Sequence, residues 1–177
     1  MCYIRQERSR GKEKKMDKAY TPEDILLMAV QAKDRGVDLY LALAHNSENY
    51  HVARLFMELA KDEKKHKHEL EKWRERFSGH EREEAYPGER SVYLNNLVES
   101  NAYNCDIATK KALEKTISEE DALRAGIGFE KDFMLFMHDL KHNADDEAQE
   151  AIDTLIGDEI RHLKDIFELK DRLEKGE

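Results

Sequence analysis

Apolar residues recur alternately every three and four positions through four long stretches of this chain. This spacing is typical of a helix with one apolar face and differs from the strict alternation of a half-buried strand. The stretches run from about 22 to 45, 50 to 78, 118 to 143 and 145 to 173. Four helices of this length, each with a single apolar face, predict an all-α fold, an antiparallel four-helix bundle.

The predicted helix boundaries rest on start signals in the sequence. Thr21 and Pro22 supply an N-cap hydroxyl and a proline at the first helical position, and Ser118 followed by Asp121 is a second start signal. The first and second helices, and the third and fourth, are separated by only a few residues. Residues 79–117, by contrast, form a long connection between the second and third helices.

Ionisable residues interrupt each apolar seam near its middle. They are Lys33 in the first helix, Glu63 and His66 in the second, Glu130 in the third, and Glu159 and His162 in the fourth. Equivalent residues of the two helix pairs are separated by 97, 96 and 96 positions. The chain is therefore a twofold repeat of helix pairs, and we expect the six residues to meet at mid-height of the bundle.

A Glu-x-x-His pair places a carboxylate and an imidazole one turn apart on the same helical face, where both reach one ion. Buried charges are costly unless they are paired or bound to a metal. Two interpretations are therefore open. The residues form a buried salt-bridge network around Lys33, or they bind a metal through oxygen and nitrogen ligands, a set that suits iron, manganese or zinc.

Three segments of the chain carry a resemblance to a known family. Residues 55–66, 125–132 and 157–162 read LFMELAKDEKKH, AGIGFEKD and GDEIRH. With the paired Glu-x-x-His motifs, they resemble the rubrerythrin branch of the ferritin-like superfamily, over about residues 22–173. The resemblance implies a ferritin-like bundle that binds iron, in a mononuclear or di-iron site, and reacts with peroxide or dioxygen as a non-haem iron oxidoreductase. The metal ligands it implies are the bridging Glu63 and Glu159 and the terminal Glu130, His66 and His162.

The resemblance also indicates supporting residues. Asp62 and Asp158 precede the two seam glutamates, where acids of related di-iron proteins hold the histidine of the opposite motif; the alternative is plain surface charge. Tyr40 lies two turns from Lys33 on the same helical face. It is a candidate redox-active or site-lining phenol, and the alternative is a core tyrosine whose hydroxyl has a hydrogen-bond partner.

Two features depart from the family pattern. With only two cysteines, the chain has no rubredoxin-like module, so redox activity would need an external electron donor. Lys33 stands where the family has its first ligand glutamate, and Phe133 stands where some rubrerythrins carry an extra carboxylate. A lysine among three glutamates supplies one positive charge, and we expect it to take the place of one divalent ion. The alternative function is a non-catalytic bundle that binds one metal or none and has a structural or interaction role.

Composition and charge limit the kinds of partner that the chain is expected to bind. A net charge of −9 argues against nucleic-acid binding, and no apolar run approaches the roughly 20 residues needed to span a membrane. We expect a cytoplasmic homodimer. Residues 1–18 contain seven basic and three acidic side chains. They predict a disordered tail before a domain over 19–177, with an anion-binding or nucleic-acid-binding arm as the alternative.

Overall fold

The computed structural model describes residues 22–77, 117–141 and 146–176 of the chain. These residues form four helices: α1 (Pro22–Asn46), α2 (Tyr50–Phe77), α5 (Glu119–Lys141) and α6 (Asp146–Glu174). The all-α prediction is confirmed, and every predicted helix boundary that falls on described residues agrees to within about two positions. The predicted tail 1–18, the N-cap Thr21 and most of the connection 79–117 lie outside the described residues.

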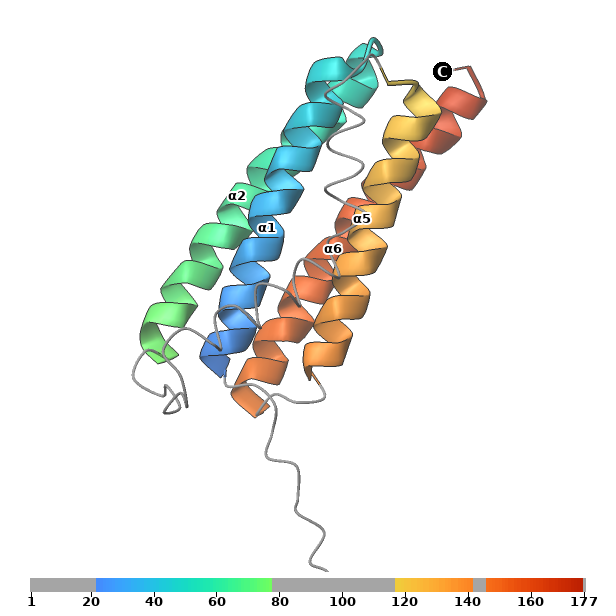
Figure 1. Ribbon diagram of the computed structural model, residues 1–177. Helices are drawn as coiled ribbons and strands as arrows, with labels where there is room; N and C mark the ends of the chain where they lie inside the picture. The colour runs from blue at the N-terminus through green and yellow to red at the C-terminus, as the bar shows by residue number, and fades with distance from the viewer. Residues whose placement is uncertain (1–21, 78–116, 142–145, 177) are drawn as a thin grey trace, which may run out of the picture.

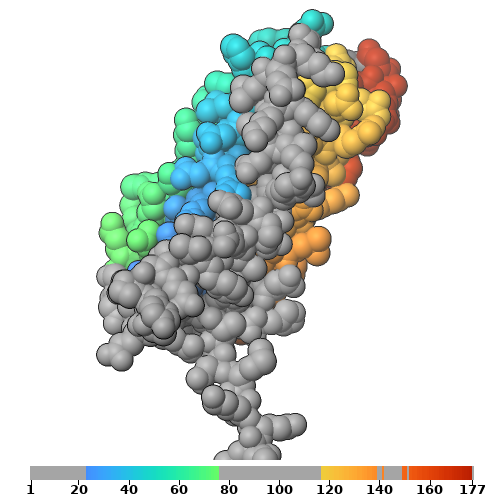
Figure 2. Space-filling view, in the orientation of Figure 1, coloured from blue at the N-terminus to red at the C-terminus, as the bar shows by residue number. Residues whose placement is uncertain are grey.

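The helices run side by side in an elongated bundle (Figure 1). Its neighbouring pairs are α1 with α2, α5 with α6, α1 with α5, and α2 with α6. In Figure 1 each neighbouring pair runs in opposite directions, whereas α2 and α5, which contact across the diagonal, run in the same direction. The space-filling view shows α1 and α2 along one long edge and α5 and α6 along the other (Figure 2). This is the antiparallel four-helix arrangement that the seams predict.

Local hydrogen bonds explain why two of the helices begin where they do. Asn49 caps α2, because its side-chain oxygen accepts hydrogen bonds from the backbone amides of His51 and Val52, at 2.8 and 3.2 Å. Ser118 caps α5 in the predicted way, accepting from the amide of Asp121 at 3.2 Å and donating to its carboxylate at 2.8 Å. Such a cap contributes about 1 kcal/mol to helix stability.

A short contact joins the end of α1 to the start of α5. The backbone amide of Ile117 donates to the carbonyl of Asn46 at 3.2 Å, and Ser47 and Ile117 form an isolated parallel bridge. The side chain of Asn49 also donates to Glu119 at 2.7 Å. These bonds fix the two helix pairs to each other at one end of the bundle.

Within the described residues, no helix is long and apolar enough to cross a membrane.

The core consists of two apolar clusters with a polar layer between them. One cluster holds residues such as Ile25, Leu70 and Ile152, and the other holds residues such as Leu43 and Phe56. Along each of the four helices, the ionisable seam residue or pair falls between the part that enters the first cluster and the part that enters the second. The layer is therefore closed above and below by packed apolar side chains.

Candidate metal centre

The polar layer contains the six residues that the seams predicted to converge. Lys33, Glu63, Glu130, Glu159 and His162 have no exposed surface, and His66 is 3% exposed. Each charged group at this depth needs a partner, because the interior solvates charge poorly. The contacts within the layer supply those partners, and they divide the layer into a part around Lys33 and a part around His162.

Lys33 forms the first part of the layer. Its ammonium nitrogen lies 2.8 and 3.0 Å from the two carboxylate oxygens of Glu63, and it donates to Oε1 of Glu159 at 2.5 Å. The ring of Phe133 lies on another side of the ammonium, with its centroid 4.1 Å from Nζ. An ammonium over an aromatic face is stabilised by the ring's charge distribution. Lys33 is thus held by two carboxylates and one aromatic ring.

His162 forms the second part. Its Nδ1 lies 3.3 Å from Oε1 of Glu63, 3.3 Å from Oε1 of Glu130 and 3.5 Å from Oε2 of Glu159. Oxygen and nitrogen donors at about 2.1 Å from one tetrahedral ion lie about 3.4 Å from one another. The three distances from Nδ1 of His162 agree with that value, and all the donors lie within 4.8 Å of one another.

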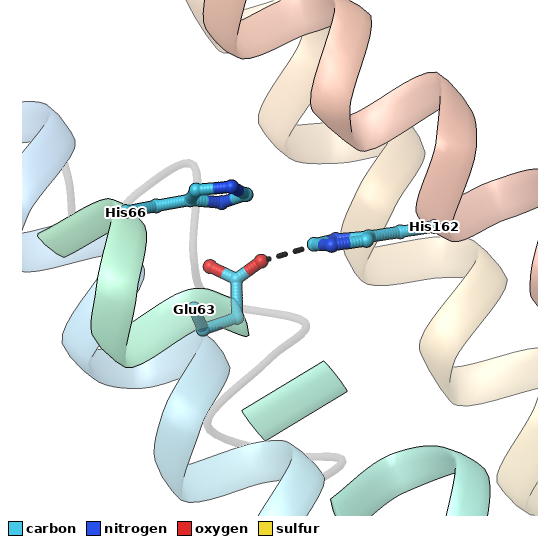
Figure 3. Close-up of side chains that lie close together, drawn as sticks. All are labelled: Glu63, His66 and His162. Carbon is cyan, nitrogen blue, oxygen red and sulfur yellow. Dashed lines mark ion pairs between the residues drawn. The ribbon is translucent and has the colours of Figure 1, made fainter. Parts of the chain in front are cut away.

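The two histidines face the layer from two neighbouring helices, His66 from α2 and His162 from α6 (Figure 3). Their rings are nearly parallel, with centroids 5.5 Å apart and planes at 22°. Figure 3 shows the Glu63 carboxylate reaching toward His162, and the dashed line marks that contact. His66 Nδ1 is more distant from the carboxylates, with Glu159 Oε1 at 3.8 Å.

A carboxylate lies behind each histidine, and each comes from the opposite helix. Asp158 Oδ2 is 3.2 Å from Nε2 of His66, and Asp62 Oδ2 is 3.6 Å from Nε2 of His162. Asp158 is within hydrogen-bond distance of its histidine, whereas Asp62 lies slightly beyond that distance from His162. A carboxylate near Nε2 favours a proton on that nitrogen, so that Nδ1 is the ring atom turned toward the layer. The two carboxylates thus lie crosswise between α2 and α6, and their role in supporting metal-binding histidines stays a prediction.

Tyr40 contacts the layer through its hydroxyl. The hydroxyl donates a hydrogen bond to Oε1 of Glu130, and the ring packs against Phe56 and Phe129, each at 5.5 Å between centroids. Tyr40 is therefore a buried core residue with a satisfied hydroxyl, and that hydroxyl also orients a predicted ligand. Whether the phenol takes part in redox chemistry stays a prediction.

The pKa values of these groups depend on burial and on their neighbours. Burial lowers the pKa of Lys33, but Glu63, Glu159 and Glu130 outweigh it and raise that pKa above its ordinary value. Burial raises the pKa of Glu159, yet the charge of Lys33 and the nearby His162 bring it below its ordinary value. The pKa of His66 is lowered, first by burial and then by the charge of Lys33, so this histidine is neutral at pH 7.

The pKa values of Glu130 and His162 are set by other neighbours, because Lys33 does not contact either residue. Burial and the charge of Glu159 raise the pKa of Glu130 to about 8. Burial lowers the pKa of His162, but Glu130, Glu159 and Glu63 around the ring raise it well above its ordinary value. Without a metal, both shifts favour the protonated forms of these two groups.

Several donor atoms in this part of the layer are buried and unsatisfied. Within the described part of the chain, Oε2 of Glu130, Oε2 of Glu159 and Nδ1 of His162 have no hydrogen-bond partner. Leaving such an atom unpaired costs about 1–3 kcal/mol. Glu63, Glu130, Glu159 and His162 each offer one ligand atom, and these atoms all lie within 4.8 Å of one another. One divalent ion among these four residues would contact a ligand atom of each, so the residues fit a metal.

Sequence reasoning missed two residues of the layer's surroundings. Phe133 is noted in the sequence only as standing in place of a carboxylate, and its ring lies over the ammonium of Lys33. Arg161 was not singled out, yet its guanidinium lies 3.3 Å from Asp158 and 3.9 Å from Asp62, between the two carboxylates that face the histidines. The three-residue spacing from Asp158 to Arg161 was the available signal, since such residues are neighbours on a helix.

Comparison with known proteins gives one result. The family model described as Rubrerythrin matches residues 24–170, which includes all six residues of the polar layer. A comparison with curated proteins gave no significant match. A comparison with solved structures gave none either.

Proposed function

This chain belongs to the rubrerythrin family, and from that premise we propose that its buried carboxylate and histidine cluster binds iron for redox chemistry with peroxide or dioxygen. The observation that carries the proposal is the set of three carboxylates from three helices around Nδ1 of His162, at 3.3–3.5 Å. Iron would supply the exchange of one electron between its ferrous and ferric forms. Manganese and zinc suit the same donors, and iron is the metal expected from the family.

Four residues would hold the ion: Glu63, Glu130, Glu159 and His162. Their own contacts prepare them for this role. Tyr40 holds Glu130 through its hydroxyl, and Asp62 stands behind His162 so that Nδ1 faces the other donors. The apolar clusters on both sides exclude water and keep the donors in place. Since the chain has only two cysteines, the electrons would come from an external donor.

The test is anaerobic titration of metal-free protein with Fe²⁺, followed by elemental analysis per chain and exposure to hydrogen peroxide. We expect iron to bind and then to be oxidised, with a new near-ultraviolet absorption. His162→Ala should bind no iron, because the ion loses the one donor that faces all three carboxylates. Native protein that takes up no iron in this titration would end the proposal.

A second function is favoured by the contacts of Lys33. Its ion pairs give both Glu63 and Glu159 a positively charged contact without any metal, so the bundle can keep its polar layer as a structural feature. In that case the protein would be a non-catalytic member of the family with an interaction role. Fe²⁺ that binds but is not oxidised by peroxide, or no binding at all, would favour this second function.

A further inference from the structure

The internal repeat defines two equivalent halves of the polar layer. Lys33 in α1 corresponds to Glu130 in α5, and His66 in α2 corresponds to His162 in α6, at offsets of 97 and 96 residues. Glu63 and Glu159, also 96 residues apart, lie between the halves and contact both. One half thus contains Lys33 and His66, and the other contains Glu130 and His162.

The two shared carboxylates join these halves. Glu159 turns Oε1 toward Lys33 at 2.5 Å and Oε2 toward His162 at 3.5 Å. Glu63 places both oxygens near Lys33, with Oε2 at 2.8 Å and Oε1 at 3.0 Å, and the same Oε1 lies 3.3 Å from His162. Each carboxylate therefore bridges two positive positions. One of those positions is already filled by the nitrogen of Lys33.

We propose that the ammonium of Lys33 permanently occupies one of two cation positions, so that the cluster accepts a single divalent ion, on the His162 side. This inference rests on the proposed metal binding and specifies its stoichiometry. Lys33 is fully buried between the two bridging carboxylates, where a second ion would have to bind. An ion and an ammonium cannot share that position.

The charges of the layer agree with one ion. Metal binding requires deprotonated ligands. In that form Glu63, Glu130 and Glu159 carry three negative charges and Lys33 carries one positive charge, so that two negative charges remain for one divalent ion to neutralise. With a second ion, the layer would keep two uncompensated positive charges. Buried charge without compensation is strongly unfavourable.

The lysine half also lacks the ligands that a second ion needs. Among the described acidic side chains, those within ion-pair distance of Lys33 are Glu63 and Glu159, which already serve the other half. Phe133 closes the remaining side of the ammonium with an apolar ring, 4.1 Å from Nζ to the centroid. His66 Nδ1 would be the one unshared donor here. Among the described residues, the group that could hold an ion with His66 is completed by Glu63 and His162, and both also belong to the group on the His162 side, so a second ion would have to take its other donors from the first.

The test counts ions in the native chain and in Lys33→Glu. Metal-free protein is titrated anaerobically with Fe²⁺, passed through a desalting column and analysed for iron per chain. We expect one ion in the native protein and two in Lys33→Glu, because this change removes the fixed cation and gives both halves a glutamate. Lys64→Glu is the control, since Lys64 is exposed on α2 and the substitution changes the net charge equally. It should bind one ion.

The number of ions bound per chain tests this inference separately from the proposed metal binding on which it rests. Two ions in the native protein would overturn the inference and leave metal binding standing, whereas no ion would overturn both. One ion in both proteins would show that Lys33 does not exclude the second, and would also overturn the inference. If Lys33→Glu does not fold, Mn²⁺ in the native protein gives the answer by electron paramagnetic resonance. An isolated Mn²⁺ signal is expected, and the signal of a coupled pair would contradict the inference.

Discussion

At the scale of single residues, each histidine of the polar layer lies between carboxylates. One carboxylate from the opposite helix stands behind the ring, and the glutamates of the layer stand in front of it. The two histidines differ in what they face: His162 faces one oxygen from each of three carboxylates, and His66 faces the part of the layer that Lys33 fills. Their supporting aspartates should therefore differ in importance for metal binding.

Asp62→Ala should weaken binding of the ion at His162 by about tenfold or more, because residues that orient a ligand histidine typically contribute 10–100-fold to affinity. Asp62 is about half exposed, so its removal leaves the fold intact. Asp158→Ala is the matched control, because Asp158 stands behind His66, and its effect on affinity should be much smaller. Competition titration with a chelator measures both, and equal losses would contradict the assignment of the ion to the His162 side.

Lys33→Met should destabilise the metal-free protein by about 3–5 kcal/mol, since it leaves Glu63 and Glu159 buried without their shared counterion. Urea unfolding in the presence of a chelator measures this loss. Lys67→Met is the control, because Lys67 pairs with Asp34 at the surface, where such pairs contribute less than about 1 kcal/mol. Losses of similar size in the two variants would show that the buried pairs of Lys33 are not important for stability.

At the scale of helices, the sequence was sufficient for most of the architecture. The period of the apolar residues placed α1, α2, α5 and α6 and their buried faces, because burial of one face is the main determinant of a helix in a bundle. The same period predicted the level at which the ionisable residues meet. It could not predict which oxygen faces which cation, or that Phe133 and Arg161 take part, since side-chain direction depends on packing between helices.

Packing between helices also leaves different amounts of space for a side chain at two glycines of α5. A Cβ atom on Gly126 would lie 2.7 Å from the ring of Phe56 and 3.2 Å from Ile166, whereas a Cβ atom on Gly128 would meet nothing within 4 Å. Gly126→Ala should therefore destabilise the protein by about 1–3 kcal/mol through overpacking. Gly128→Ala should stabilise it by about 0.5–1 kcal/mol, because alanine is the better helix former. Thermal unfolding of both variants measures the difference, and a loss in Gly128→Ala equal to that in Gly126→Ala would contradict this packing.

At the scale of the whole molecule, the polar layer joins the two helix pairs. Lys33 and Glu63 belong to the α1–α2 pair, whereas Glu130, Glu159 and His162 belong to the α5–α6 pair. The ion pair of Lys33 with Glu159 and the contact of Glu63 with His162 cross between the pairs. A metal ion in this layer would therefore bind to the assembled bundle and not to either pair alone.

Metal removal should lower the melting temperature for this reason. A ligand that binds only the folded state, at a hundredfold excess over its dissociation constant, stabilises by about 2.7 kcal/mol. Each kcal/mol shifts the melting temperature of a protein of this size by about 2–4 °C. Thermal scans with Fe²⁺ and with a chelator should differ accordingly, and His162→Ala should melt at one temperature in both. Identical melting of the native protein under the two conditions would favour the structural role of the layer.

The position of Lys33 in the chain has a consequence for biosynthesis. Lys33 and Glu63 are 30 residues apart within the first helix pair, so both leave the ribosome before α5 and α6 have been made. A nascent α1–α2 hairpin that closes on itself carries the counterion for its buried carboxylate as part of the polypeptide. Glu159 in α6 completes the ion pairs later, when the second hairpin docks. On this view the bundle would assemble without a metal, and the ion of the proposed function would enter only after translation is finished.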